Sequence, residues 1–394
     1  MQAINSGAYG TVYKQDGYAV KKFQKVGHVV QEYIALKYLS DCPHVVRAVS
    51  CNLSDDDPSL TMELMDDNFA NWYLRIRQRS YKYYYPLLWD ALQQILIGIA
   101  EIHDHYLVHG DIKPGNVLVN FVSDSGLRNE RRSPSGAERN DGLRTSGAER
   151  NERQSPSEGN EGPVEVKIGD CGFVSLARYS KTDRTARPYR DPHPQHHYGH
   201  DIYSYAIIFL QTYGQMPLYG EANDPANLRR MIMSEPLLDR YRDILLAMVQ
   251  SDATQRPDAR QCLVELFGYH MPQYELRINF AYTGKALTES QNQVIRKFLT
   301  KLSKQYELNH SHKSYKALVV YLQEQRIDES EHLLCCLGLL LIMTTSFSLT
   351  SKNLPWDKIK DLGRKYGYQS DDILRSLQRM IDNYEFVQLL IYQN

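Results

Sequence analysis

The chain has 394 residues, of which 42% are apolar and 24% charged, a balance typical of a globular protein with two or three domains. Its 46 basic and 47 acidic side chains give a net charge of −1, so no overall field favours nucleic acid or a membrane surface as a partner. The six cysteines form no Cys-x-x-Cys pair and no His-spaced cluster, which predicts neither a zinc site nor a disulfide framework.

Targeting signals are not evident in the sequence. The N-terminus lacks the features of a secretory signal peptide, and the longest apolar run, Leu333–Met343, is shorter than the ~20 residues that span a bilayer. We therefore expect a protein of a reducing compartment, which means the cytoplasm or, alternatively, the nucleus.

Short runs of β-type residues dominate the first 65 residues. They are separated by turn signals such as Asp16-Gly17 and surround one amphipathic segment with helical spacing, Val29–Leu39. The pattern predicts a small sheet that carries one helix. The expected strands are Gly10–Tyr13, Tyr18–Phe23, Val45–Cys51 and Ser59–Leu64.

Helical periodicity takes over from Pro86 onward, so residues 66–270 are expected to form a second, mainly helical part. Its predicted helices are Leu87–Tyr106, Ile202–Tyr213, Asn227–Met233, Leu237–Gln250 and Ala259–Phe267. After a linker at residues 271–287, a third, all-α domain is expected at residues 288–394. Its predicted helices are Glu289–Tyr306, Ser311–Gln325, Glu329–Thr345, Trp356–Tyr366 and Asp371–Tyr384.

Residues 123–163 interrupt the second part. These 41 residues contain no aromatic side chain, and their only large aliphatic ones are Leu127 and Leu143. The string SGAERN occurs twice, at Ser135–Asn140 and Ser146–Asn151. Because so little apolar surface cannot offset the conformational entropy lost on folding, we expect a disordered loop.

Residues suited to phosphate binding lie in the first strands. The unit Gly7-Ala8-Tyr9-Gly10-Thr11-Val12 has glycines that let backbone N–H groups approach a phosphate closely, although an ordinary glycine hairpin would look the same. Lys21 follows in the next strand and Glu32 on the next helix. Such a carboxylate can hold the lysine in place for phosphate oxygens, but a lone Lys/Glu pair is more commonly a solvated surface pair.

The most informative stretch is Val108–Val119, which reads VHGDIKPGNVLV. It places Asp111 and Asn116 in the D-x-x-x-x-N spacing of a phosphoryl-transfer loop, where the carboxylate orients the attacking hydroxyl and the amide oxygen ligates magnesium. A second carboxylate, Asp170, follows in KIGDCG. Asn116 and Asp170 are 54 positions apart, and subtracting the 41-residue segment leaves 13, enough for a two-stranded hairpin.

Together these motifs resemble those of the eukaryotic protein kinase family over roughly residues 1–270. The resemblance implies an α+β, bilobal kinase fold with a β-rich N-lobe (residues 1–65), a helical C-lobe (residues 66–270), and ATP and Mg²⁺ bound between the lobes. It implies catalytic roles for Asp111, Lys113 and Lys21, with Lys113 in the position typical of Ser/Thr kinases.

The same resemblance assigns further residues. It implies that nucleotide is bound by Gly7, Gly10, Val12, Ala19, Lys21, Glu32, Met62, Glu63 and Met65, and magnesium by Asn116 and Asp170. Met62, Glu63 and Met65 belong to the segment that resembles the gatekeeper and hinge. Asp201 resembles the aspartate that supports the catalytic loop, and Arg256 resembles the late arginine of the C-lobe.

Four positions depart from the kinase pattern. Asn5 replaces the first loop glycine, Gly110 the arginine of His-Arg-Asp, Cys171 the phenylalanine of Asp-Phe-Gly, and His193 the glutamate of Ala-Pro-Glu. Without that arginine, activation should not require phosphorylation of the activation segment. Because His193 cannot form the usual ion pair with Arg256, the stability of the segment from residue 171 to 192 is in doubt.

The third domain resembles a cyclin box. Phe298–Leu308, Leu333–Thr345 and Asp371–Phe386 have the order and spacing of successive cyclin-box helices, although Phe347 and Leu377 stand where that family has a charged pair. A generic helical bundle is the alternative, because periodicity alone does not separate the two. The length of the helix around Glu32 likewise resembles that of the cyclin-contacting helix in cyclin-dependent kinases.

The resemblances imply a Ser/Thr protein kinase that transfers the γ-phosphoryl group of ATP to protein hydroxyls and is activated in cis by the cyclin-like domain. They imply protein substrates and ATP as partners, contact between the helical domain and helix Val29–Leu39, and no nucleic-acid or membrane partner. The alternative is a pseudokinase scaffold or nucleotide-binding adaptor without catalysis. The repeated insertion and the compressed N-lobe also resemble kinases of large DNA viruses, whose setting would be the host-cell cytoplasm.

Overall fold

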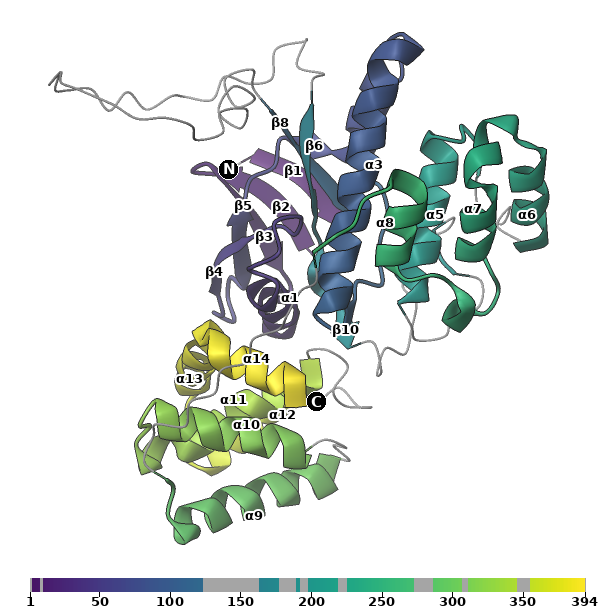
Figure 1. Cartoon of the computed structure of the whole chain (residues 1–394). Helices are drawn as coiled ribbons and strands as arrows, with labels where there is room; N and C mark the ends of the chain where they lie inside the picture. The colour runs from purple at the N-terminus through teal and green to yellow at the C-terminus, as the bar shows by residue number, and fades with distance from the viewer. Residues whose placement is uncertain are drawn as a thin grey trace, which may run out of the picture.

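The computed structural model describes residues 2–7, 10–122, 163–176, 189–191, 198–218, 225–272, 286–306, 311–345 and 355–393. Three groups of elements follow one another along the chain: an N-terminal sheet with one helix, a helical part beside it, and a bundle of helices at the C-terminus (Figure 1). No helix of these described ranges is both long and apolar enough to cross a bilayer.

The N-terminal sheet has five antiparallel strands in the order β1-β2-β3-β5-β4. The strands are β1 (Gln2–Gly7), β2 (Gly10–Gln15), β3 (Tyr18–Phe23), β4 (Ala48–Asn52) and β5 (Ser59–Glu63). Asp16 and Gly17 join β2 to β3 with φ values of 50° and 82°, the conformation that a two-residue hairpin turn requires at both positions. Alternation along β3 buries Lys21 on the same face as Phe23.

Helix α1 (Val26–Tyr38) crosses this sheet, and nine of its 13 residues are buried. A helix covered on one side only would keep a polar face, but α1 contacts β4 and β5 as well as the C-terminal helices α11, α13 and α14. The predicted helix was correct in type and begins three residues earlier than the Val29 that the periodicity indicated. The burial of α1 therefore depends both on the N-terminal sheet and on the C-terminal helices.

The helical part begins after β6 (Asp67–Asn68). Its main helices are α2 (Phe69–Ile76), α3 (Tyr81–Asp104), α5 (Gly199–Thr212), α6 (Pro225–Ser234), α7 (Arg242–Met248) and α8 (Ala259–Phe267), with short 3₁₀ turns at Cys171–Phe173, Pro236–Tyr241 and Ala253–Gln255. The sequence pattern missed α2 and started α3 at Leu87, because Pro86 was treated as a boundary. In the fold Pro86 lies inside α3, whose first turns pack through Tyr81 against Tyr85.

Two small ladders frame the site described below. Strands β8 (Val117–Phe121) and β9 (Val164–Ile168) form a hairpin whose last pair is Phe121 with Val164. The predicted insertion, residues 123–163, lies outside the described residues except for Pro163, and the ladder places it at the open end of this hairpin. Strand β7 (Leu107–Val108) pairs with β10 (Ser175–Leu176).

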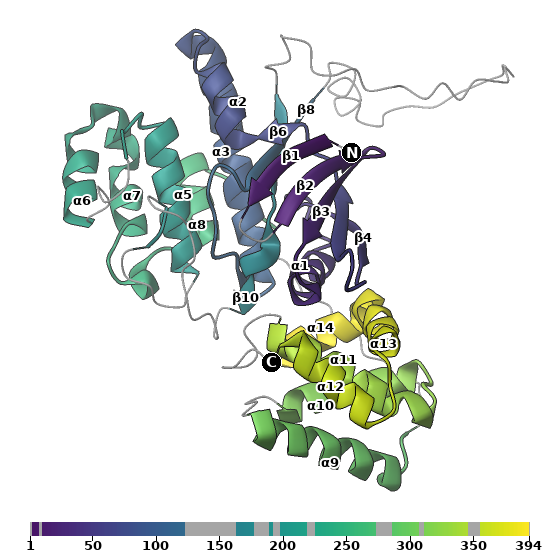
Figure 2. The same cartoon turned by 180° about the vertical axis from the view of Figure 1, so that it is seen from behind.

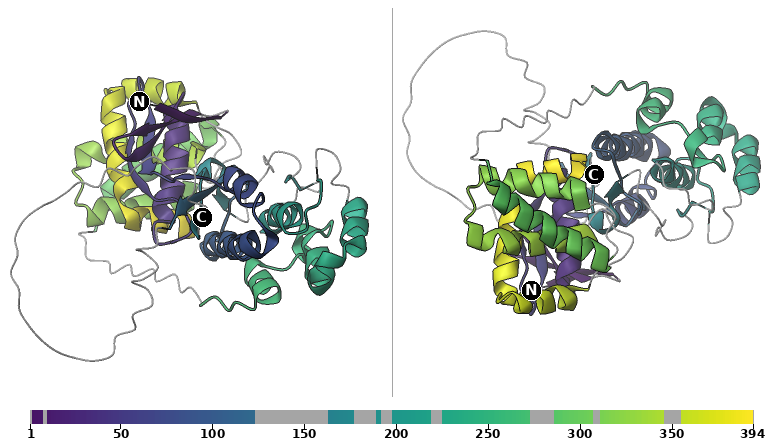
Figure 3. Two further views of the ribbon diagram at one scale, coloured as in Figure 1. Left: turned by 90° about the horizontal axis from the view of Figure 1, so that it is seen from above. Right: turned by 90° about the horizontal axis from the view of Figure 1, so that it is seen from below.

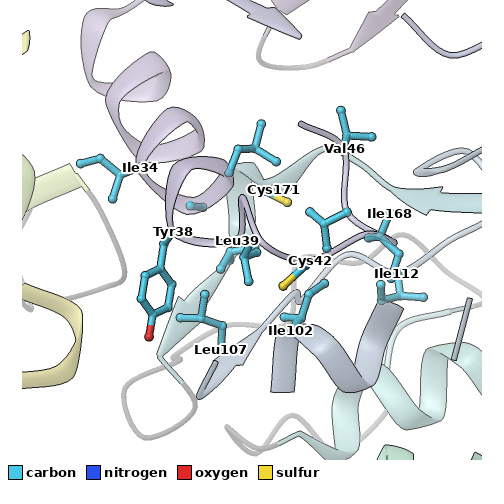
Figure 4. Close-up of a cluster of buried hydrophobic side chains, with 14 of the residues drawn as sticks. Ile34, Tyr38, Leu39, Cys42, Val46, Ile102, Leu107, Ile112, Ile168 and Cys171 are labelled. Carbon is cyan, nitrogen blue, oxygen red and sulfur yellow. The ribbon is translucent and has the colours of Figure 1, made fainter. Parts of the chain in front are cut away.

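A continuous apolar core joins the sheet to the helical part. Figure 4 shows Leu39 at the C-terminal end of α1, Cys42 and Val46 after it, and Ile102 of α3 and Ile168 of β9 gathered in one cluster of buried side chains. A parallel bridge between Val45 and Ile168 crosses the same boundary. This packing fixes the end of α1 relative to β9, which leads directly to Asp170.

The C-terminal bundle is built around α11 (His332–Thr345), in which 12 of 14 residues are buried. The surrounding helices are α9 (Glu289–Tyr306), α10 (Ser311–Glu324), α12 (Trp356–Lys365), α13 (Ser370–Asp382) and α14 (Tyr384–Gln393). The predicted helix Asp371–Tyr384 is two helices, since the backbone of Asn383 is extended (ψ 103°) and α14 starts after it. Phe347, at a position compared with the cyclin pattern, lies outside the described residues.

The bundle packs directly against the N-terminal sheet and its helix. Figures 1 and 2 show α13 and α14 beside α1, and Figure 3 shows the bundle and the sheet overlapping when the molecule is viewed from above and from below. Side-chain hydrogen bonds cross this boundary from Tyr33 to Asp382 (2.6 Å), from Trp356 to Asp55 (2.5 Å) and from Tyr384 to Asp41 (3.0 Å). The first residues of α1 also fit tightly, since a Cβ on Gly27 would lie 2.9 Å from Cγ2 of Thr345.

Candidate active site

Three charged groups meet under the sheet, where β3, α1 and the end of β9 converge. Nζ of Lys21 lies 2.7 Å from Oε2 of Glu32 and 2.6 Å from Oδ1 of Asp170. Lys21 and Glu32 are buried, whereas the side chain of Asp170 is 38% exposed. The sequence-based pairing of Lys21 with Glu32 is present, and Lys21 also bridges to Asp170.

The ionisation of these groups follows from burial and from their mutual charges. Burial raises the pKa of Glu32 to about 7, and the charge of Asp170 adds to this rise, in spite of the opposing charge of Lys21. Oε1 of the carboxylate has no hydrogen-bond partner among the described residues. Burial tends to lower the pKa of Lys21, but the charges of Glu32 and Asp170 outweigh it and raise that pKa above its ordinary value. Burial likewise opposes ionisation of Asp170, yet Lys21 holds its pKa below the ordinary value.

The loop between β7 and β8 presents a second carboxylate, Asp111. Nζ of Lys113 and Nδ2 of Asn116 donate to its Oδ2 at 2.6 and 2.8 Å, and Nδ2 of Asn116 also donates to the backbone oxygen of Asp111. Oδ1 of Asp111 is buried and has no partner among the described residues. A buried carboxylate oxygen without a partner is costly and is suited to accept a hydrogen bond from an incoming hydroxyl.

Asp201, in the first turn of α5, holds this loop from below. Its two oxygens accept the backbone N–H groups of His109 and Gly110 at 2.8 and 2.9 Å, and Nε2 of His103 lies 3.0 Å from Oδ2. Burial opposes ionisation of Asp201, but these donors keep its pKa below the ordinary value. Gly110 has φ of +75°, so the residue that replaces the expected arginine sits in a conformation that favours glycine.

The remaining nucleotide-binding candidates line the sheet around Lys21. Val12 is the direct cross-strand partner of Lys21, and Ala19 is the partner of Met62. Met62 and Met65 are buried, and the backbone N–H of Met65 has no hydrogen bond among the described residues. Such a group is available to bond the edge of a planar base.

Two candidates have additional roles that the sequence did not reveal. The carboxylate of Glu63 accepts hydrogen bonds from Lys167 at 3.0 Å and from the backbone of Arg47 at 2.7 Å, so its side chain ties the hinge to β9. A Cβ on Gly10 would lie 2.1 Å from the backbone oxygen of Lys22, so strand packing itself requires glycine there. Gly7 ends β1, and the turn between Gly7 and Gly10 lies outside the described residues.

Arg256 has an acidic partner at a position that the sequence comparison did not consider. The doubt about the stability of the segment from residue 171 to 192 is not tested, because residues 177–188 and 192 lie outside the described residues. His193 lies outside the described residues, but Arg256 is not left without an acidic partner, since both of its terminal nitrogens donate to Asp191. The sequence reasoning missed Asp191 because it compared only the position of the usual glutamate. A search for any carboxylate within two residues of position 193 would have found Asp191.

Magnesium was predicted at Asn116 and Asp170. The amide nitrogen of Asn116 is used by Asp111, which leaves its Oδ1 as an acceptor, and Lys21 uses Oδ1 of Asp170, which leaves Oδ2 without a partner among the described residues. Amide and carboxylate oxygens are the donors that Mg²⁺ prefers. The residues present therefore fit the ion.

Comparison with known proteins places this site in a family. Residues 1–267 match the family model described as "Protein kinase domain". That match covers more than half of the 394 residues and ends before the C-terminal bundle. The chain therefore belongs to the protein kinase family.

Individual relatives are distant. A Wee1-like protein kinase 2 of Danio rerio is 27% identical over 281 residues, which cover 66% of this chain and 49% of the relative. The sporulation protein kinase mde3 of Schizosaccharomyces pombe is 25% identical over 273 residues (60% and 41%), and the serine/threonine-protein kinase SSN3 of Coccidioides immitis is 28% identical over 155 residues (33% and 33%). The chain spans about half or less of the length of these relatives, and Wee1-like kinases recur among them, so they do not point specifically to cyclin-dependent kinases.

Proposed function

We propose that this member of the protein kinase family is an active enzyme that transfers the γ-phosphoryl group of ATP to Ser or Thr hydroxyls of proteins. The observation that carries the proposal is the convergence of Lys21, Asp170 and Asp111 from three separate elements, with Lys21 held by Glu32 at 2.7 Å. A scaffold that had lost catalysis would have no need for a buried, unpartnered Oδ1 on Asp111.

Each residue has a defined task in this reaction. Lys21, fixed between two carboxylates, binds phosphate oxygens and orients ATP. Oδ1 of Asp111 accepts the hydrogen bond of the attacking hydroxyl, while Lys113 beside it neutralises charge that develops on the transferred group. Mg²⁺, held by Asn116 and Asp170, supplies further neutralisation of the phosphates when it is bound.

The preference for Ser and Thr is supported by Lys113. Its Nζ lies 2.6 Å from Asp111, within reach of the phosphoryl group that meets the hydroxyl there, and one matching relative is named a serine/threonine-protein kinase. The Wee1-like names state only a protein kinase. A peptide library that presents Ser, Thr and Tyr acceptors separately would decide the acceptor class.

Activation in cis by a cyclin-like C-terminal domain is the second part of the proposal. It is supported by the contacts of α1 with α11, α13 and α14 and by the hydrogen bond from Tyr33, the neighbour of Glu32, to Asp382. Gly110 replaces the arginine that would bind a phosphorylated activation segment, so another contact must stabilise the active conformation. Docking of the bundle on α1 stabilises this conformation by holding Glu32 toward Lys21.

The cellular compartment and the binding partners of the protein are also proposals. All six cysteines are unpaired, which is compatible with a reducing compartment such as the cytoplasm or nucleus. The expected partners are ATP and protein substrates, without nucleic acid or membrane. The resemblance to kinases of large DNA viruses was based on the repeated insertion, which lies outside the described residues except for Pro163, and on the compressed N-lobe, and it stays a prediction.

The test is incorporation of labelled phosphate from ATP into protein by the wild type and by Asp111→Asn and Lys21→Met. We expect both variants to lose turnover while they keep the unfolding temperature of the wild type to within a few degrees. Lys22→Met is the matched control, because Lys22 is paired with Asp57 on the surface and should retain activity. Equal incorporation by wild type and Asp111→Asn would instead support a non-catalytic scaffold.

A further inference from the structure

Helix α9, the first helix of the C-terminal bundle, carries three lysines on one face. Lys297, Lys301 and Lys304 are spaced by four and three positions, and all three are exposed. At about 100° per residue they lie within about 60° of one another around the helix, and they span about 10 Å along its axis. We refer to these three residues as the lysine stripe.

The lysine stripe lies opposite the buried face of α9. That face consists of Ile295, Phe298, Leu299 and Leu302, and α9 packs against α10 and α11. Figures 1 and 2 show α9 on the side of the bundle that faces away from the N-terminal sheet. The stripe is therefore on the outer surface of the bundle, remote from the contact with α1.

The positive charges of the stripe are not balanced by neighbouring carboxylates. Helix α9 has no acidic residue after Glu289, and among the described residues no carboxylate lies within ion-pair distance of the three lysines. Two other helices of the bundle differ, since Arg364 pairs with Asp361 in α12 and Arg375 pairs with Asp372 in α13. A helix surface that is merely solvated commonly mixes the two signs, as α12 and α13 do.

This arrangement is unfavourable within the chain itself. Like charges three and four positions apart on a helix repel each other. Lys304 lies in the last turn, where the helix dipole favours a cation, but Lys297 and Lys301 lie too far from the C-terminal end to benefit. Arg296 is placed differently, because its guanidinium lies 5.0 Å from the ring of Tyr315 on α10. An anionic partner would relieve the repulsion within the stripe.

Two exposed apolar groups border the stripe. Val294 is 49% exposed and lies one turn before Phe298 on α9. Tyr366, at the end of α12, is 38% exposed, and its ring lies 5.2 Å from that of Phe298. In the part of the bundle that the structure describes, these two are the large apolar side chains that are more than a third exposed. A partner that combines carboxylates with an apolar side chain fits this surface.

We propose that the lysine stripe, together with Val294 and Tyr366, binds a short acidic segment of the protein substrates. Charge complementarity carries the proposal, and a helical segment with carboxylates at the same four- and three-residue spacing would match the three lysines along their full span. The proposal rests on the proposed kinase function and deepens it. It names the substrate class as proteins that carry an acidic segment separate from the phosphorylated hydroxyl.

Nucleic acid and membrane surfaces fit this face less well. The net charge of −1 gives no long-range attraction for a long polyanion, and the stripe spans about 10 Å. Stacking of unpaired bases requires several exposed rings, whereas among the described residues of this face Tyr366 is the one aromatic side chain that is exposed. A membrane-binding helix needs a broad exposed apolar face, but the apolar face of α9 is buried in the bundle.

The first experiment measures binding of a labelled synthetic peptide, rich in glutamate and with a leucine at one end, to the full chain by fluorescence anisotropy. Lys297→Gln/Lys301→Gln/Lys304→Gln removes the charges of the stripe and keeps residues that favour a helix. We expect about 10-fold weaker binding, as the loss of three exposed charge pairs implies, at an unchanged unfolding temperature. Binding to the wild type should weaken as salt is added, because salt screens exposed charges.

Lys358→Gln/Arg364→Gln/Arg375→Gln is the matched control, because it removes the same number of positive charges from exposed positions of α12 and α13. It should bind the peptide as the wild type does. Equal loss in both triple variants, or unchanged binding in the stripe variant, would overturn the proposal. Tighter, stripe-dependent binding of a single-stranded oligonucleotide or of vesicles that contain phosphatidylserine would also overturn it, in favour of that partner.

The second experiment compares two substrates with the same phosphoacceptor sequence, one of which continues into the acidic segment. In the wild type the segment should lower KM by about 10-fold and leave kcat unchanged, because docking strengthens the ground state and the transition state equally. The stripe variant should lose this advantage and should phosphorylate the substrate without the segment as the wild type does. A preference that persists in the stripe variant would contradict docking at α9.

Together the two experiments separate the docking site from the kinase function. If the peptide binds through the stripe but the wild type transfers phosphate to no protein or peptide, the proposed kinase function fails and the site for an acidic segment stands. If the wild type is active but does not bind the peptide, the docking site fails and the kinase function stands.

Discussion

The hydroxyl of Tyr33 donates a 2.6 Å hydrogen bond to Asp382, which is 349 positions away in the chain. Tyr33 directly follows Glu32, whose carboxylate lies 2.7 Å from Lys21. Adjacent residues on a helix point about 100° apart, so one turn of α1 faces the candidate active site with Glu32 and the C-terminal bundle with Tyr33. Rotation or displacement of α1 would change both contacts together.

Tyr33→Phe should therefore weaken docking of the bundle on α1 without changing any residue of the candidate active site. Removing one partly buried hydrogen bond costs about 0.5 to 1.5 kcal/mol, so we expect a small fall in the free energy of unfolding and faster amide exchange in α1. Kinase activity should fall by a few-fold as Glu32 becomes less well held. Tyr366→Phe is the control, since Tyr366 packs on Phe298 away from this boundary, and an identical response of both variants would contradict the coupling.

A steric test addresses the same boundary at Gly27. In an isolated helix Gly27→Ala should stabilise α1 by about 1 kcal/mol, because alanine has the higher helix propensity. Here the new Cβ would lie 2.9 Å from Cγ2 of Thr345, a stiff β-branched side chain, so we expect net destabilisation and lower activity.

Thr345→Ser supplies the rescue. Serine lacks the methyl group but keeps a hydroxyl able to donate to the backbone oxygen of Leu341, as Thr345 does at 2.7 Å. The double variant Gly27→Ala/Thr345→Ser should regain the stability and activity that Gly27→Ala loses, measured by urea unfolding and phosphate transfer. Loss without rescue would show that the contact at Gly27 is not the cause.

The pH dependence of activity should report Glu32. Because its pKa is raised to about 7, the carboxyl loses its proton, and the ion pair with Lys21 gains its full charge, as pH rises through about 7. Activity should rise over the same range. Asp170, Lys21 and Cys171 keep their charge states over this range, since the pKa of Asp170 is lowered and those of Lys21 and Cys171 are raised.

Stability should change in the opposite direction. The unfolded chain releases this proton near the ordinary value of 4.5, whereas the folded protein keeps it up to about 7, so the Glu32 contribution falls as pH rises between these values. Glu32→Gln should remove that slope from urea unfolding curves and should also remove the rise of the residual activity. An unchanged slope in Glu32→Gln would assign the titration to another group.

The insertion should be dispensable for catalysis. Phe121 pairs with Val164, and the backbone of Val122 donates to Pro163, so the hairpin is closed before residue 123. Replacing residues 123–162 with a short Asn-Gly turn should leave kcat and KM for ATP within about two-fold of the wild type, since long surface loops add little closure cost. A large fall in ATP turnover would show that the segment contacts the site.

The candidate site residues could be predicted from the sequence by itself. Asp111, Asn116 and Asp170 were predicted as candidate site residues from their spacings relative to strands and glycines. The two-stranded hairpin between Asn116 and Asp170 was predicted by subtracting the segment that is poor in apolar residues. The strands β2, β3 and β5 and the type of α1 also followed from short-range patterns. Helices α2 and α14 did not, because each is short and its burial comes from distant elements.

Only the tertiary structure decided which carboxylate pairs with Arg256 and which residues join α1 to the C-terminal bundle. Asp191 reaches Arg256 because residues 189–191 lie along α5, whereas the sequence comparison considered only position 193 and expected no ion pair there. The pattern of Val29–Leu39 predicted an amphipathic helix, and contact with the C-terminal helices was expected only from the resemblance to a cyclin box. The residues that make the contact were not predicted, since pairs 349 positions apart, such as Tyr33 and Asp382, leave no periodic signal in either segment. Long-range pairing depends on how whole elements pack, and that packing is a property of the folded chain.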